Sequence, residues 1–144
     1  MQVLVDTPIW SLALRRTSSD LNPSEQSLTA MLRELIRDRR AQLIGPVRQE
    51  LLSGIRHETS FRKLRGQLRA FDEPRLDSFD YEEAARIHNQ CRSRGIAGSP
   101  IDFLICAAAH RRSWEIFTTD RDFARYASAS PLKLFRIGVP QNPL

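Results

Sequence analysis

The sequence predicts an α/β domain whose mostly parallel sheet is covered by helices on both faces. Short apolar runs typical of buried strands occur at 1–5, 43–45 and 115–118. The chain between them carries apolar residues at helical spacing, so strands and helices alternate. The first run is rich in valine and ends abruptly at Asp6, which is typical of a central strand buried on both faces.

Length and composition favour one folded domain. With 144 residues the chain suits a single domain, which we expect to span 1–144. Its 41% hydrophobic and 27% charged residues indicate neither disorder nor a membrane protein. The longest apolar stretch, 101–109, is too short to cross a bilayer, and no signal peptide is recognisable. We therefore expect a cytoplasmic protein without membrane contact.

The helices are predicted from caps and periodicity. Asn22-Pro23-Ser24-Glu25 has the pattern of a helix start, and an apolar stripe continues to about Arg40. Pro46 opens a helix that carries Glu50 on the same face as Val47 and Leu51. Further helices are expected over 61–71, from a capping box at Asp80 and Glu83 to Gly95, and from Ser99 through 103–109. A short helix that ends at about 127 and a last strand near 132–135 complete the pattern.

The cations suggest a polyanionic partner. The net charge is +5, and only Lys63 and Lys133 among the 22 basic residues are lysines. Arginine binds phosphate through two parallel hydrogen bonds, so this balance fits nucleic acid, although a solvated basic face explains it as well. The most basic segment surrounds the helix over 61–71, where RNA- or partner-contacting residues and a solvated face are equally good interpretations. Its cations are Arg56, Arg62, Lys63, Arg65 and Arg69.

Cysteine and histidine give no sign of a metal site. Cys91 and Cys106 lie in helical patterns, and we interpret them as reduced packing residues. His57, His88 and His110 have no spacing typical of zinc ligands and are expected at the surface or at helix ends.

Four acids stand in unusual places. Asp6 and Asp120 each end an apolar strand, Glu50 lies on the apolar side of its helix, and Asp102 occupies the first turn of a buried helix. Each has a structural explanation by itself, such as a helix cap, a turn hydrogen bond or a buried ion pair. Together they point to one crevice, because parallel strand ends and the following helix starts meet at one sheet edge.

Such a cluster needs a compensating charge. Two carboxylates about 4 Å apart repel by roughly 4 kcal/mol at an effective dielectric constant near 20. Mg²⁺ or Mn²⁺ is the natural compensation, because these hard cations bind carboxylate oxygen and need no histidine or cysteine. The chemistry that this predicts is phosphodiester hydrolysis.

The segments around these acids resemble the motifs of PIN-domain ribonucleases, and specifically of the VapC toxins of bacterial type II toxin–antitoxin pairs. The resemblance covers nearly the whole chain. Each motif is weak alone, but their order and placement are specific. The four segments are Val5-Asp6-Thr7, Gln49-Glu50-Leu51-Leu52-Ser53-Gly54, Asp102 to Ala109, and Thr118-Thr119-Asp120-Arg121-Asp122-Phe123.

The resemblance implies a three-layer α/β/α sandwich with Asp6, Glu50, Asp102 and Asp120 around one or two Mg²⁺ or Mn²⁺ ions. Thr7 would orient Asp6 or a metal-bound water, and Thr118 and Asp122 would be accessory residues. It also implies a homodimer, inhibition by a cognate VapB-type antitoxin, and structured RNA, transfer or ribosomal, as substrate. One departure is Pro8, where the family more often has serine or asparagine.

Two other functions fit parts of the pattern. The first is a catalytically silent PIN-like module that binds RNA or an acidic protein partner. The second is a phosphatase that uses Asp6 as nucleophile, as in haloacid-dehalogenase-like enzymes. That family has a second aspartate two residues later, where this chain has Pro8, so we discount it.

Overall fold

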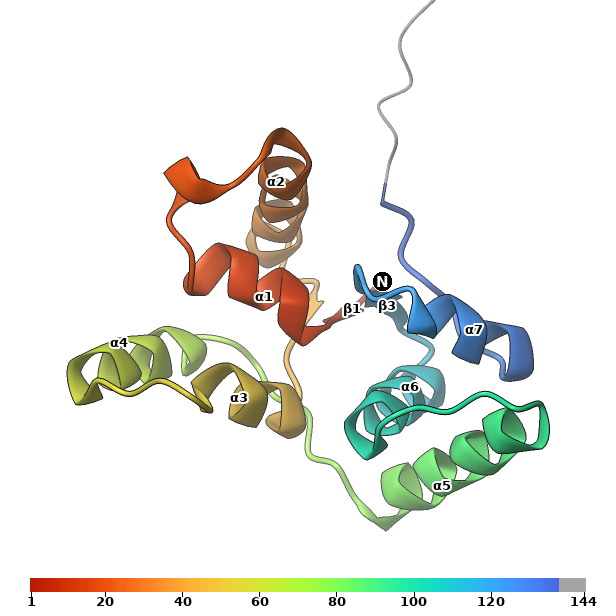
Figure 1. Cartoon of the computed structure of the whole chain (residues 1–144). Coiled ribbons are helices and arrows are strands. Elements are labelled where there is room, and N and C mark those ends of the chain that lie inside the picture. The colour runs from red at the N-terminus through yellow and green to blue at the C-terminus, as the bar shows by residue number, and fades with distance from the viewer. Residues whose placement is uncertain (138–144) are drawn as a thin grey trace, which may run out of the picture.

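A parallel three-stranded sheet lies at the centre of the fold, with helices packed on both of its faces (Figure 1). The computed structural model describes residues 1–137. The strand order is β2-β1-β3, with β1 (Val3–Val5) in the middle, β2 (Ala41–Gln42) on one side and β3 (Glu115–Phe117) on the other. Val3 pairs with Ala41 and with Glu115. The predicted α/β/α class is confirmed.

Seven α-helices connect and cover the strands within residues 1–137. Their bounds are α1 (Thr7–Leu14), α2 (Pro23–Arg37), α3 (Gly45–Leu52), α4 (Glu58–Leu68), α5 (Ser78–Ser93), α6 (Pro100–Arg112) and α7 (Asp122–Ala129), with a 3₁₀ turn η1 (Ser18–Asp20). None of the helices in this part of the chain is long and apolar enough to cross a membrane.

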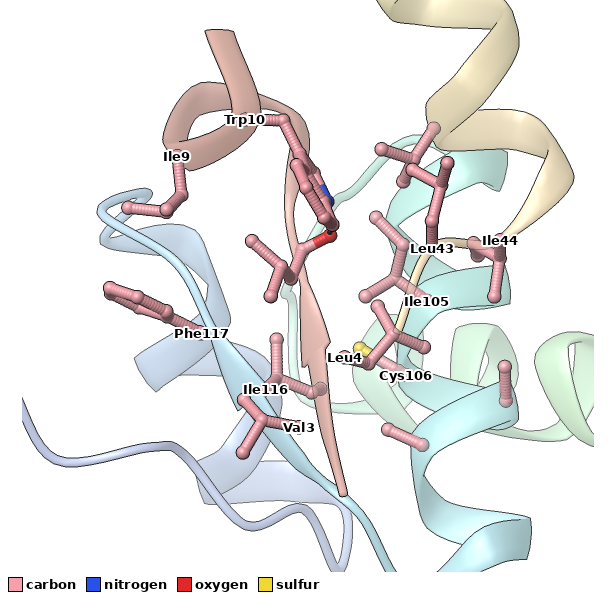
Figure 2. Packing of buried hydrophobic residues seen from close by; sticks show 14 of the residues in the cluster. Val3, Leu4, Ile9, Trp10, Leu43, Ile44, Ile105, Cys106, Ile116 and Phe117 are labelled. Atoms are coloured by element: carbon pink, nitrogen blue, oxygen red, sulfur yellow. Dashed lines mark hydrogen bonds between the residues drawn. The ribbon is translucent and has the colours of Figure 1, made fainter. Parts of the chain in front are cut away.

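The core is built on β1. Its three side chains are completely buried, as expected for a strand covered on both faces. Figure 2 shows Leu4 directed toward α6, which contributes Ile105 and Cys106. Both cysteines are free and buried, so their predicted role as packing residues is confirmed.

The opening segment contains a helix that the sequence pattern did not predict. Chain 7–14 is α1, which starts directly after Asp6 with Pro8 in its first turn. Proline fits there because the first helical N–H groups have no partner within the helix. The indole of Trp10 donates a hydrogen bond of 3.1 Å to the Val5 carbonyl, which fixes the helix against β1 (Figure 2). The strand itself covers only 3–5, within the apolar run over 1–5 that predicted it.

Other element boundaries also differ from the predictions. The second strand is 41–42, and Leu43 and Ile44 are buried residues that lead into α3. The capping box of α5 is formed by Asp77 and Asp80, one turn earlier than expected. Helix α4 starts at Glu58, earlier than the predicted 61. The predicted last strand is reduced to one isolated parallel bridge, between Ile116 and Leu134.

Two helix predictions are confirmed in detail. Asn22 and Glu25 form a reciprocal capping box at the start of α2, with the Asn22 side chain 2.8 Å from the Glu25 amide. Just past the C-terminal end of α5, Gly95 has a φ of +72°, the left-handed conformation that glycine adopts without strain.

Candidate active site

A cavity of about 600 Å³ opens at the carboxyl edge of the sheet, and all four predicted acids line it. We call it the acid cavity. Its walls come from the start of α1, the end of α3, the first turn of α6 and the loop after β3. No lysine, arginine or histidine belongs to the lining set, which is Asp6, Thr7, Pro8, Ser11, Gln49, Glu50, Ser53, Ile101, Asp102 and Asp120.

Asp6 is the most enclosed of these acids, with 5% of its surface exposed. Its carboxylate accepts hydrogen bonds from the Thr7 amide at 2.8 Å and from the Thr118 hydroxyl at 2.7 Å. Burial outweighs these two hydrogen bonds and, with nearby Asp102 and Glu50, raises the pKa of Asp6 to about 6. The Asp6 amide donates to the Phe117 carbonyl at 2.9 Å, so strand pairing positions the residue.

Glu50 reaches the acid cavity from α3 and is held by Thr7. The Thr7 hydroxyl donates to the Glu50 carboxylate. The family resemblance implied that Thr7 would orient Asp6 or a metal-bound water. The structure shows that its hydroxyl holds a different acid, while Thr118 supports Asp6. The reason is geometric, because Thr7 lies in the first turn of α1, a helix that packs against α3.

Asp102 is supported by a residue that no sequence motif indicated, Tyr126. The hydroxyl of Tyr126, from α7, donates to Asp102 at 2.7 Å. Ser99 caps α6 by accepting from the Asp102 amide at 3.1 Å. Burial raises the pKa of Asp102 despite these contacts, and Asp120 and Glu50 raise it further. Tyr126 is fully buried, and burial together with Asp102 raises the pKa of its hydroxyl.

Gly98 makes room for Tyr126. A Cβ atom at position 98 would lie 2.5 Å from the Tyr126 hydroxyl and 2.8 Å from Cζ of Phe103. Any side chain there would therefore displace the tyrosine from Asp102. The sequence shows Tyr126 only as an apolar-face residue of a short helix, because its partner lies 24 residues away and no local pattern predicts that contact.

Asp120 and Asp122 occupy different positions. Asp120 lines the acid cavity, whereas Asp122 is outside the lining set and lies in the first turn of α7. The Asp122 amide donates to the Asp120 carboxylate at 2.9 Å, and the Thr118 hydroxyl accepts from the Asp120 amide at 3.0 Å. Asp122 therefore contributes backbone support, and Asp120 is the acid that faces the cavity.

The acids fit a hard divalent cation by type and by charge. Burial and neighbouring acids raise the pKa of Asp6 and of Asp102, and all four acids share a cavity whose lining has no cationic side chain. Within residues 1–137, however, no three acidic, histidine or cysteine side chains converge closely enough to enclose a metal ion. Three of the carboxylates are instead turned to Thr118, Thr7 and Tyr126. Mg²⁺ keeps several water ligands, so full convergence is not required for its binding.

The predicted basic residues divide between two environments. Arg56 and Lys63 line a separate cavity beside α4. Arg62 pairs with Glu58 at 3.1 Å on the exposed side of the helix, and Arg65 lies 5.9 Å from the Phe61 ring centre. Arg69 is exposed at the end of α4.

The histidines lie where the sequence suggested. His57 precedes α4, His110 lies in the last turn of α6, and exposed His88 stacks on Phe103 with ring centres 4.9 Å apart.

Comparison with known proteins identifies the family. Residues 3–129 match the PIN domain, and the chain therefore belongs to the PIN-domain family. The recognition made from the four acidic segments is confirmed. No curated protein matches the sequence in a direct comparison.

Solved structures share the fold. VapBC2 from Rickettsia felis, bound to a DNA fragment from its promoter, superimposes with a TM-score of 0.74 at 18% identity, over 94% of this chain and 98% of that one. FitAcB from Neisseria gonorrhoeae gives 0.71 at 20% identity, over 94% and 97%. DNA-bound VapBC from Salmonella typhimurium gives 0.70 at 15% identity, over 94% and 97%.

Proposed function

We propose that this protein is a metal-dependent endoribonuclease that acts as the toxin of a toxin–antitoxin pair. The observation that carries the proposal is the acid cavity. Four carboxylates from segments far apart in the sequence line one cavity without a cationic side chain among its lining residues. The cationic partners that buried structural acids usually have are missing from these lining residues, which favours an external cation.

Asp6, Glu50, Asp102 and Asp120 would hold Mg²⁺ or Mn²⁺. When bound, such an ion supplies a Lewis acid that activates water and neutralises charge on a phosphate. Thr118, Thr7 and Tyr126 hold the carboxylates of Asp6, Glu50 and Asp102 in fixed orientations. Burial keeps the Asp6 carboxyl partly protonated near pH 6, so its full charge develops only above that pH.

The biological setting of the proposal draws on the family resemblance. Structured RNA, such as transfer or ribosomal RNA, is the proposed substrate, and a VapB-type antitoxin is the proposed inhibitor. Both structural neighbours named VapBC, and FitAcB, share this fold over more than nine tenths of the chain, which supports a toxin role. A single domain, a homodimer and action in the cytoplasm complete the proposal.

The test is cleavage mapping. Purified protein is incubated with total cellular RNA in Mg²⁺ or in EDTA, and new 5′ ends are mapped. We expect new ends in Mg²⁺ alone, and none with an Asp6→Asn or Asp102→Asn variant. Variants that cut as fast as the parent would show that these acids are not part of the mechanism.

The second candidate is a silent module that binds RNA or an acidic protein without cutting it. The observation in its favour is that no three ligand side chains within residues 1–137 enclose a metal position. Calorimetric titration with Mg²⁺ separates the two functions. A nuclease binds the ion and loses that binding with Asp6→Asn, whereas the silent module shows no metal-dependent heat with either protein.

A further inference from the structure

A second cavity, of about 510 Å³, is lined by cations and polar side chains together with three aliphatic residues, Leu14, Ile55 and Leu64. We call it the basic pocket. Arg15 comes from the end of α1, Arg56 and His57 from the turn before α4, and Ser60 and Lys63 from α4. No aspartate or glutamate belongs to its lining set. The basic pocket and the acid cavity are therefore opposite in charge.

The two cavities follow one another along the same two elements. Ser53 lines the acid cavity and the next residue, Gly54, lines the basic pocket. On α1, Ser11 lines the acid cavity, and Arg15, one turn later on the same helix face, lines the basic pocket. Helix α1 contacts α3, and α3 contacts α4, as Figure 1 shows. A nucleic-acid strand that leaves the acid cavity along α1 would reach the basic pocket next.

The cations of the basic pocket are available to a ligand. Within residues 1–137, Arg15, Arg56 and Lys63 form no ion pair or side-chain hydrogen bond, and all three are exposed. Arg62, on the same helix as Lys63, is engaged with Glu58. Helix α4 also begins without a side-chain cap at His57, so its first N–H groups add positive potential at this end.

We propose that the basic pocket binds backbone phosphates of an RNA strand whose neighbouring phosphodiester lies in the acid cavity. This inference rests on the proposed nuclease function and names how its substrate is held. The acid cavity by itself repels a polyanion, so attraction must come from beside it. Three free cations that follow directly on the cleavage cavity supply that attraction.

Only two of the five cations predicted from the sequence line the basic pocket. Arg56 and Lys63 belong to the phosphate site, and Arg15 and His57, which were not among the predicted cations, line it as well. Arg62, Arg65 and Arg69 do not line the pocket. An acidic segment of a protein partner is the competing occupant. RNA is favoured because the pocket continues from the cavity in which the proposed reaction takes place.

Fluorescence anisotropy in EDTA tests the proposal. The probe is a fluorescein-labelled single-stranded RNA of about twelve nucleotides, and the variant is Arg15→Ala/Arg56→Ala/Lys63→Ala. We expect the Kd of this variant for the RNA to rise at least about tenfold. The negative slope of log affinity against log salt should become about 2 less steep, because each lost phosphate contact on a single strand contributes about 0.7.

A charge-matched control separates the pocket from net charge. Arg33→Ala/Arg37→Ala/Arg86→Ala removes three exposed arginines on α2 and α5 and should change the Kd less than about threefold. Thermal unfolding of both triple variants checks the fold. A single Arg56→Glu variant, which reverses one exposed charge, should also weaken RNA binding and serves if the triple variant unfolds.

Two results would overturn the proposal. One is equal weakening by the control, which would assign binding to net charge. The other is parental affinity in the pocket variant, which would leave an acidic protein segment as the occupant. If the parent cuts RNA and the pocket variant binds RNA with the parental affinity, the proposed phosphate site is wrong but the nuclease function stands. A parent that binds RNA through the pocket but never cuts it contradicts only the nuclease.

Discussion

Two aspartates in this protein are almost completely buried, and their surroundings are opposite. Asp6 is 5% exposed and has hydroxyl and amide partners with two further acids nearby. Asp80 is 0% exposed and is held by two arginines, Arg112 at 2.7 Å and Arg111 at 2.8 Å. Burial is the same, but only one of the two charges is compensated within the fold.

The pKa values follow this difference. Burial raises the pKa of Asp6 to about 6. Burial opposes ionisation of Asp80 as well, but hydrogen bonds from Arg112, the Asp77 backbone and Arg111 outweigh it and hold the pKa of Asp80 well below its usual range. A buried carboxylate is thus a sign of function only when the protein leaves its charge without a cationic partner.

The largest expected effect separates the two aspartates by activity. Asp6→Asn should lower RNA cleavage in Mg²⁺ by about a thousandfold, because the neutral amide removes charge stabilisation at the proposed reaction site. Asp80→Asn should leave the rate per folded molecule within about threefold, since Asp80 lies outside the acid cavity. Cleavage assays normalised to the folded fraction measure both, and equal losses would remove the distinction.

The order of the two substitutions should be reversed for stability, with Asp80→Asn having the larger effect. Asp80→Asn breaks a buried ion pair and should lower the free energy of unfolding by about 3 kcal/mol, because Arg111 and Arg112 lose their shared partner. Asp6→Asn should not lower stability at pH 7 in EDTA, since it removes an uncompensated charge. Urea unfolding measures both changes. Destabilisation of both variants by the same amount would show that Asp6 is also a structural acid.

The pH dependence of stability sharpens the comparison further. Between pH 4 and about 6 the folded protein retains the Asp6 proton that the unfolded chain releases. The contribution of Asp6 therefore falls by about 2–3 kcal/mol as pH rises through this window. The contribution of Asp80 has the opposite sign and is lost as pH falls below about 4.

Unfolding in EDTA at several pH values, for the parent and Asp6→Asn, checks this prediction. The stability difference between the two proteins should grow between pH 4 and 6 and then level off. A constant difference would mean that Asp6 titrates at its ordinary pKa. Mg²⁺ should reduce the difference at pH 7 but not at pH 5, because a proton competes with the metal.

The smallest expected effect concerns the support of Asp102. Tyr126→Phe removes one hydroxyl and leaves the ring in its packing with Phe103 and Phe123. We expect metal affinity or cleavage to fall about tenfold, the lower end for loss of a group that orients a ligand. Gly98→Ala should produce a similar loss by displacing the ring. Mg²⁺ titration and cleavage rates measure both, and parental values in both variants would show that Asp102 needs no such support.

Local sequence rules determined much of this protein. Apolar runs placed β1 and β3, and the Asn22 and Glu25 side chains announced α2 through a cap that involves only four neighbouring residues. The four acids could be selected from their positions, because two end apolar strands, one lies on the apolar side of a helix and one occupies the first turn of a buried helix. The same rules missed α1, because Pro8 was not recognised as a helix start in the segment after Asp6.

The partners of the acids were decided only by the tertiary structure. Thr118 reaches Asp6 across 112 residues, Thr7 reaches Glu50 across 43, and Arg112 reaches Asp80 across 32. Caps and periodicity depend on contacts within a few residues, and they cannot state which distant side chain a carboxylate will meet. That choice separates the compensated Asp80 from the uncompensated Asp6, and it arises from how the helices pack around β1.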